Sequence, residues 1–245
     1  MSRFLALVVL VVLPLAAAAQ DYEREKRWAA EVLPSLVVGD AVQLKLPAGR
    51  EFLGLYTEGK PGQRAVLLVH GVGVHPDHGV IGILRASLAD RGFTTLSIQM
   101  PVQKSDATVD DYYPKVFPEA VARIQAGADW LKGRGHANPV LLSHSMGSWM
   151  SNVYYEKTAQ PPFAAWICMG LTGGFGGMGN VRVPVLDVHG EQDLPQVLRA
   201  EGRRRGTLAG IPGSRQVKVP GADHHYNGRD RELTAAIVTF LGELK

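Results

Sequence analysis

This 245-residue chain has a single cysteine and a small net charge. The only cysteine, Cys168, lies in an apolar run, which excludes an internal disulfide and predicts a buried, inert thiol. The net charge of +3 at pH 7 is small for this length, so we expect no nucleic-acid partner. Internal repeats and low-complexity tracts are also missing. With 46% hydrophobic residues, the chain is expected to form one domain over residues 20–245.

The N-terminus has the features of an export signal. Arg3 precedes an apolar run over residues 4–15, and four alanines ending at Ala19 lead into a polar segment. This pattern predicts a signal peptide over residues 1–19 and a periplasmic or secreted protein without a stable membrane anchor after cleavage. The alternative is a membrane anchor, but the apolar run is shorter than the ~20 residues that span a bilayer. Lipid attachment near the cleavage site is excluded, because the nearest cysteine is Cys168.

The remaining sequence alternates between two kinds of segment. An initial helix over 22–36, which Pro34 interrupts or ends, and a hairpin at 41–46 and 51–56 are followed by continuous apolar segments and segments of helical spacing. This alternation predicts an α/β fold with a mostly parallel central sheet covered by helices on both faces. Ligands of such sheets bind beyond the carboxyl ends of the strands. The expected strands are 65–69, 94–100, 140–142, 164–169, 183–188 and 216–219, and the expected helices are 81–89, 116–131, 146–155, 194–206 and 231–244.

Three residues with complementary chemistry follow predicted strands closely. Ser145 lies in SHSMG, Asp193 ends HGEQD, and His224 ends GADH. A serine hydroxyl is a weak nucleophile until a base accepts its proton, and histidine has a pKa suited to that task. A carboxylate can hold the imidazole in the required tautomer. The order serine, aspartate, histidine therefore favours nucleophilic catalysis over the alternative in which Ser145 is an ordinary turn or N-cap residue.

Together with His70-Gly71, which follows the strand expected at 65–69, these motifs resemble the α/β-hydrolase superfamily over nearly all of the chain after the signal. The chain looks closest to small dienelactone-hydrolase-like enzymes and to exported bacterial relatives of uncertain substrate. The resemblance implies an α/β-hydrolase fold with a minimal lid or none, and a serine hydrolase that needs no metal or organic cofactor. It assigns the catalytic roles to Ser145, Asp193 and His224, and the oxyanion-binding N–H groups to Val72 and Met146.

The chain departs from the family pattern at one position. Ser143 stands where the motif usually has its first glycine. The flanking residues of this strained turn must be small, and serine adds only a hydroxymethyl group. Gly147 keeps the more crowded helix side open, so we expect the turn to tolerate Ser143.

Neighbouring residues compete for two of the catalytic roles, and two further histidines need another explanation. His70-Gly71 resembles the start of the family's oxyanion loop, and His70 is expected to support that loop by hydrogen bonds. His144 is expected to make a packing or polar contact. The competing residues are His225 for the base, and Glu191 or Asp223 for the acid.

The substrate site is expected to be open and shallow. Only residues 171–182 lie between two expected strands, which is too short for a lid domain. The loop over 102–118 is the largest candidate for a substrate wall. The expected rim residues are His70, His75, Tyr112 and Tyr113.

A metal site is the main alternative within residues 70–78. His70, His75, Asp77 and His78 loosely resemble the His-x-His-x-Asp-His run of metallo-β-lactamase-like hydrolases. However, Gly73 stands where that run needs its first histidine, and no second histidine-rich segment is present. We therefore expect no metal.

The sequence predicts an exported serine hydrolase that cleaves an ester or related carbonyl bond in a small molecule or on a polymer. The same residues could transfer the acyl group to an alcohol instead of water. A non-catalytic binding or envelope protein on this fold is the contrasting hypothesis. The residues do not indicate an oligomeric state or a particular substrate.

Overall fold

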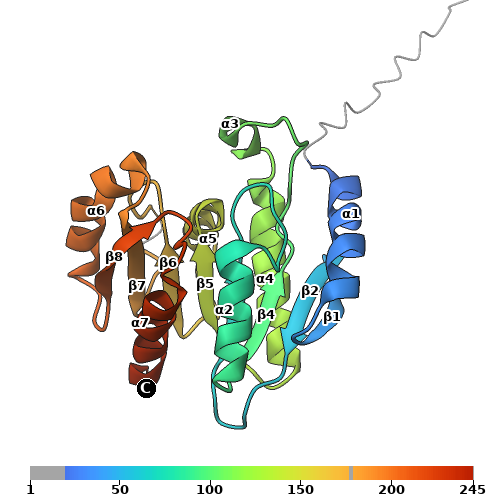
Figure 1. Ribbon diagram of the computed structural model, residues 1–245, viewed down its shortest axis with the longest axis horizontal. Helices are drawn as coiled ribbons and strands as arrows, with labels where there is room; N and C mark the ends of the chain where they lie inside the picture. Colours follow the sequence, from blue (N-terminus) through green and yellow to red (C-terminus); the bar gives the residue numbers. More distant parts are fainter. Residues whose placement is uncertain (1–19, 177–178, 245) are drawn as a thin grey trace, which may run out of the picture.

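The strands of the computed structural model, which describes residues 20–176 and 179–244, form one sheet (Figure 1). The strands are β1 (Asp40–Lys45), β2 (Glu51–Thr57), β3 (Ala65–Val69), β4 (Thr94–Ile98), β5 (Val140–His144), β6 (Ala165–Met169), β7 (Val185–Gln192) and β8 (Arg215–Asp223). Their order is β1-β2-β4-β3-β5-β6-β7-β8. The β2 strand is antiparallel to β1 and β4, and the other neighbouring pairs are parallel. The predicted mostly parallel sheet is therefore confirmed.

Helices cover both faces of this sheet. They are α1 (Tyr22–Val32), the 3-10 turn η1 (Leu33–Ser35), α2 (Gly79–Asp90), α3 (Val109–Tyr112), α4 (Phe117–Gly133), α5 (Met146–Lys157), α6 (Pro195–Leu208) and α7 (Asp230–Glu243). Helices α2 and α7 lie side by side on one face (Figure 1), where α1 covers β2, and the apolar sides of α4, α5 and α6 pack on the other. The short helix α3 was not expected from the sequence.

Burial on both faces explains why the central strand β3 is apolar throughout. Every residue of β3 is buried, and successive side chains point to opposite faces. Val66 and Leu68 join the cluster beneath α2 and α7, whereas Leu67 and Val69 join the cluster beneath α4 and α5. A polar residue at any of these positions would lose hydration without gaining a partner.

Two sequence predictions concern segments that the structure describes incompletely. The signal peptide over residues 1–19 lies outside the described residues. Residues 170–184 connect β6 to β7, and 177–178 of that connection are also outside them. Within the described residues, no helix is both long enough and apolar enough to cross a membrane.

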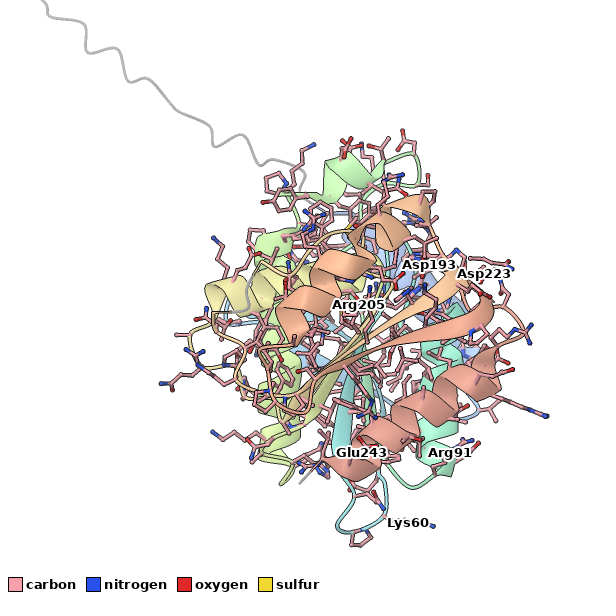
Figure 2. The ribbon with its side chains drawn as sticks, turned by 90° about the vertical axis from the view of Figure 1, so that its left-hand side faces the viewer. Lys60, Arg91, Asp193, Arg205, Asp223 and Glu243 are labelled. Atoms are coloured by element: carbon pink, nitrogen blue, oxygen red, sulfur yellow. The ribbon has the colours of Figure 1, made fainter. Side chains whose placement is uncertain are left out.

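The sheet brings distant parts of the chain to one edge. Because β3, β5, β7 and β8 are parallel, their carboxyl ends all meet there. Figure 2 shows Asp193 and Asp223, which follow β7 and end β8, close together at this end of the molecule. Lys60 and Glu243 lie at the opposite end.

Candidate active site

Ser145 occupies a strained turn between β5 and α5. Its φ of 57° and ψ of −123° are a combination that side-chain-bearing residues rarely adopt. Its N–H donates to Met169 O at 2.9 Å, and its carbonyl accepts from Ser148 N–H at 2.9 Å. Its side chain makes no hydrogen bond that would cap α5. The serine is therefore not an ordinary N-cap, because its hydroxyl is free to face the edge of the sheet.

Two glycines allow the chain to approach this turn closely. A Cβ atom at Gly147 would lie 2.4 Å from His70 O and 2.6 Å from Val69 O, which no side chain can occupy without moving the backbone. A Cβ atom at Gly71 would lie 3.2 Å from Ser145 Cβ. The first turn of α5 thus packs directly on the end of β3, and the loop after β3 passes over the serine.

The structure brings Ser145, His224 and Asp193 into one chain of hydrogen bonds. Each is the first residue after a strand, namely β5, β8 and β7. His224 Nε2 lies 2.8 Å from Ser145 Oγ, and His224 Nδ1 lies 2.6 Å from Asp193 Oδ1. A carboxylate at Nδ1 favours the tautomer whose free Nε2 can accept the serine proton.

Asp193 is held by more than the imidazole. Burial alone would raise the pKa of this carboxyl, but hydrogen bonds from His224, Gly190 N–H and Leu194 N–H outweigh burial and lower the pKa below its usual value. The two backbone contacts measure 3.0 and 2.7 Å. Asp193 therefore stays ionised wherever the histidine can act as a base.

The competing residues are directed elsewhere. The His225 side chain is exposed, and its ring centre lies 5.3 Å from that of His224. Glu191 accepts from Gly221 N–H at 2.8 Å, and Asp223 accepts from the backbone of His225 at 2.9 Å. Neither carboxylate is hydrogen-bonded to the His224 ring, because Glu191 holds the backbone of β8 and Asp223 holds the turn that follows β8.

His144 holds the backbone of His224 in place. Its Nε2 donates to the carbonyl of His224 at 2.9 Å, and burial lowers the pKa of His144 to about 3. The ring is therefore neutral. Gly170, with a φ of +61°, leaves space for the His224 ring, since a Cβ at this position would lie 2.8 Å from His224 Cε1. The predicted polar contact of His144 thus has a defined partner.

His70 supports the loop that covers Ser145. Its Nδ1 donates to Gly71 O at 2.8 Å, and its Nε2 accepts from Met100 N–H at 2.8 Å. Burial lowers the pKa of His70 to about 3, so the ring is neutral and has a single arrangement of donor and acceptor. This agrees with the supporting role expected from the sequence.

Ser143, the departure from the motif, is fully buried and has a partner of its own. Its Oγ accepts from the indole Nε1–H of Trp166 at 2.9 Å and lies 3.2 Å from Ser148 Oγ. A glycine here would leave a buried indole donor unpaired. The serine is thus matched to Trp166 on the neighbouring strand β6.

A cavity of about 370 Å³ lies beside Ser145, and one of its walls differs from the wall that the sequence predicted. The wall comes from the start of α2 and the turn before α7 rather than from the loop over 102–118. His78 belongs to the histidine-rich segment 70–78 and His225 follows His224, but no sequence motif identified the other residues of this wall, because they are ordinary helix and turn residues. The lining residues include Val74, His78, Val80, Ile83, His225 and Asn227.

The predicted rim therefore needs correction. Tyr112 is 1% exposed and its hydroxyl accepts from Gln103 N–H at 3.1 Å, because α3 turns the ring into the core. Tyr113 is exposed but stacks on Trp149 and does not line the cavity. His75 packs edge-on against Trp28 and also lies outside the lining. Only His70 of the four lines the cavity.

The alternative metal ligands do not converge. Asp77 forms an ion pair with Arg85 at 2.6 Å, and both ring nitrogens of His70 are engaged. Among residues 20–176 and 179–244, no group of three or more histidine, cysteine, aspartate or glutamate side chains is arranged to hold a metal ion.

Comparisons with known proteins agree with this architecture. A family model described as a protein of unknown function (DUF3530) matches residues 4–121. Comparison with the curated proteins finds no match. Among solved structures, dienelactone hydrolase from Anabaena variabilis is 18% identical with a TM-score of 0.69, covering 84% of this chain and 97% of that one. The esterase Pf2001 from Pyrococcus furiosus is 13% identical with a TM-score of 0.67, covering 85% and 97%.

A third solved structure is Est1E from Butyrivibrio proteoclasticus with ferulic acid bound. It is 18% identical with a TM-score of 0.65, covering 83% of this chain and 99% of that one. At such identities the likeness concerns the fold. The chain has the α/β-hydrolase fold. This confirms the fold that the motifs around Ser145, Asp193 and His224 suggested. In an α/β-hydrolase fold the ends of the strands are where function is expected.

The partnership of Ser143 with Trp166 generates a stability prediction. Ser143→Ala removes the acceptor of a fully buried indole N–H, so we expect the free energy of unfolding to fall by about 1–3 kcal/mol. Urea denaturation measures this change. The matched control is Ser151→Ala, since Ser151 is also buried in this region and its hydroxyl bonds to no described residue. Equal stabilities of the two variants would contradict the assigned role of Ser143.

The two buried neutral histidines predict a loss of stability in acid. The folded-state pKa values of His70 and His144, about 3, lie below the value near 6.5 that each has when unfolded. As the pH falls through this window the unfolded chain takes up protons that the folded chain does not. The free energy of unfolding should fall by up to about 1.4 kcal/mol per pH unit for each histidine.

Urea denaturation between pH 7 and pH 4.5 tests this dependence. His144→Gln keeps an Nε2–H donor for the His224 carbonyl but removes the titrating ring, so its stability should depend less steeply on pH. A slope equal to that of the wild type would exclude His144 as a source of the acid sensitivity.

Proposed function

We propose that this protein is a serine hydrolase that cleaves an ester or related carbonyl bond through an acyl-enzyme on Ser145. The observation that carries the proposal is the unbroken hydrogen-bond chain from Ser145 Oγ through His224 to Asp193, with distances of 2.8 and 2.6 Å. The names of two structural neighbours, a dienelactone hydrolase and an esterase, support the same reaction class.

Acylation follows from this geometry. Ser145 Oγ attacks the substrate carbonyl carbon while its proton moves to His224 Nε2. The negative charge that develops on the carbonyl oxygen is stabilised in this proposal by the N–H groups of Met146 and Val72. Met146 begins α5, where the helix dipole also favours negative charge. The carbon–oxygen bond to the leaving alcohol then breaks, and His224 returns the proton to that oxygen.

Deacylation repeats these steps with water. His224 takes a proton from water as the water oxygen attacks the ester carbonyl carbon on Ser145. Breaking the bond to Ser145 Oγ releases the acid, and the serine recovers its proton from His224. Asp193 stabilises the imidazolium in both halves and keeps its own charge, consistent with the lowered pKa of its carboxyl.

The cavity supports a small substrate. Its volume of about 370 Å³ is near the lower end of the range for ligand pockets. Val74, Val80 and Ile83 contribute apolar parts of its lining, and His225 and Asn227 contribute polar parts. Short acyl groups, or small esters attached to a larger molecule, fit these walls better than long chains. Export through residues 1–19 remains part of the proposal and would deliver the enzyme to the periplasm or the medium.

The reactivity of Ser145 can be measured directly. A fluorophosphonate probe should label the native protein, and Ser145→Ala should abolish labelling and lower the hydrolysis of short-chain aryl esters by about 10³-fold or more. Equal labelling of native and heat-unfolded protein would argue against an activated serine.

Treatment with a strong chelator is the control for the metal alternative. It should leave both labelling and ester hydrolysis unchanged, since no step of the proposed mechanism uses a cation. An activity that disappears and returns with added zinc would instead support ligands from residues 70–78.

The identity of the base and of the acid can be tested by substitution. His224→Ala should lower kcat by about 10³-fold or more, and His225→Ala by less than about tenfold, because only His224 reaches both Ser145 and Asp193. Asp193→Asn should lower kcat by about 10⁴-fold with little change in fold, since it disturbs the imidazole tautomer. Steady-state kinetics with an aryl acetate and circular dichroism measure these outcomes. Similar losses in both histidine variants would leave His224 without its assigned role.

A further inference from the structure

Helix α1 makes a contact with the loop over Ser145 that no motif indicates. In Figure 1 the helix stands beside β2, with its first turn at the same end of the molecule as α3. Arg24 extends from that turn and donates from Nη2 to Gly73 O at 3.2 Å and from Nη1 to Gln103 O at 2.8 Å. Asp21, which caps the helix by accepting from Arg24 N–H, also donates its own N–H to Val102 O at 2.7 Å.

The loop over residues 71–76 is held through its carbonyl groups. Side chains from several parts of the fold donate to four of them, so the loop has few ways to rotate its peptide planes. The donors and their acceptors are His70 for Gly71 (2.8 Å), Arg24 for Gly73 (3.2 Å), Gln99 for Val74 (3.3 Å) and Ser97 for Pro76 (2.6 Å). Three of these donors lie in or directly after β3 and β4, and only Arg24 belongs to a separate helix.

Val72 lies between two of these anchored peptides. His70 holds the Gly71 carbonyl. Because the Gly71–Val72 peptide is trans, its Val72 N–H points in the direction opposite to that carbonyl. On the other side Gly73 has a φ of +66°, in the left-handed region that glycine enters readily, so the chain could pivot there. The Arg24 guanidinium fixes the peptide that follows this pivot. The guanidinium is itself held over the Trp28 ring, 4.5 Å from its centre.

We propose that Arg24 is a positioning residue for the oxyanion loop, and that this one contact makes α1 a support of that loop. The proposal rests on the proposed serine hydrolase function. Arg24 acts through Gly73 and not on the substrate, so its removal should weaken stabilisation of the oxyanion by Val72 N–H without disturbing the hydrogen bonds of His224. The full loss of one oxyanion donor lowers kcat by about 10²–10³-fold, which sets the upper limit of the effect.

Steady-state kinetics of Arg24 variants test this role. Arg24→Met keeps a long side chain over Trp28 but removes all donors, and we expect kcat for an aryl acetate to fall by about 10–10²-fold while KM changes less than about threefold. Arg24→Lys retains a charged donor and should recover part of the loss. The inhibition constant of a trifluoromethyl ketone, whose adduct carries an oxyanion, should rise by the same factor as kcat/KM falls.

Tyr22→Phe is the matched control. Tyr22 lies on the same helix and donates to Glu119 at 2.7 Å, so its loss removes one hydrogen bond between α1 and α4 and leaves the Arg24 contacts with the loop in place. We expect this variant to lower the melting temperature but to keep kcat within about twofold of the wild type. If Arg24 only anchored the helix, kcat would instead follow the melting temperature in both variants, and that result would overturn the proposal.

The outcomes separate this proposal from the function on which it rests. An active wild type whose Arg24→Met and Arg24→Lys variants keep full kcat would refute the positioning role alone. A wild type that neither hydrolyses esters nor reacts with a fluorophosphonate would refute both. If Arg24→Met does not fold, the partial loss expected for Arg24→Lys, with a matching change in ketone inhibition, carries the test.

Discussion

The site depends on a backbone packing constraint at the end of β3. Ser145 adopts a conformation that costs energy, and such a residue persists only where its surroundings leave no alternative. Here the carbonyls of Val69 and His70 lie so close to Gly147 that α5 can begin in only one place. Everything else at the site follows from where this turn puts the serine: its hydroxyl faces the edge where β7 and β8 end, and the loop after β3 covers it.

Around this turn the protein uses neutral histidines as rigid connectors. His70 and His144 are buried, their low pKa values keep them uncharged, and each donates one ring N–H to a backbone carbonyl. A neutral ring has one fixed donor, so it sets the orientation of the peptide it holds. Neutrality also matters electrostatically, because the His144 ring lies 5.0 Å from the ring of His224. A second positive charge there would oppose the imidazolium that the proposed mechanism forms.

Hydrogen bonds and an ion pair also link the loop over Ser145 to distant parts of the chain. Side chains after β3 and β4 hold the loop over the serine from within the sheet, and Arg24 of α1 holds it from outside. Helix α1 is in turn tied to the body of the protein by Glu25, whose carboxylate pairs with the buried Arg123 at 3.0 Å. Arg123 also donates to Gln99 O, and the side-chain amide of Gln99 lies within hydrogen-bond distance of His70 Nε2 at 3.1 Å. The loop over residues 71–76, α1 and α4 therefore form one connected polar network.

Sequence alone determined the features that have a strong local signal. Continuous apolar runs identified the strands of the parallel sheet, because a strand buried on both faces is mostly apolar. The positions of Ser145, Asp193 and His224 just after such runs indicated that they would meet, since parallel strands end at one edge. The first helix, which gives way to a 3-10 turn at Pro34, and the hairpin of β1 and β2 were visible for similar local reasons.

Only the tertiary structure decided which neighbours face the serine. His224 and His225 are adjacent in the chain, and the path of the backbone after β8 directs one toward Ser145 and the other toward solvent. Tyr112 belongs to a polar loop and had the appearance of a surface residue, but α3 turns it into the core. Arg24 and Gly73 are 49 residues apart and meet because α1 docks against β2. Such contacts depend on how whole elements pack, and no periodicity or motif within one segment carries that information.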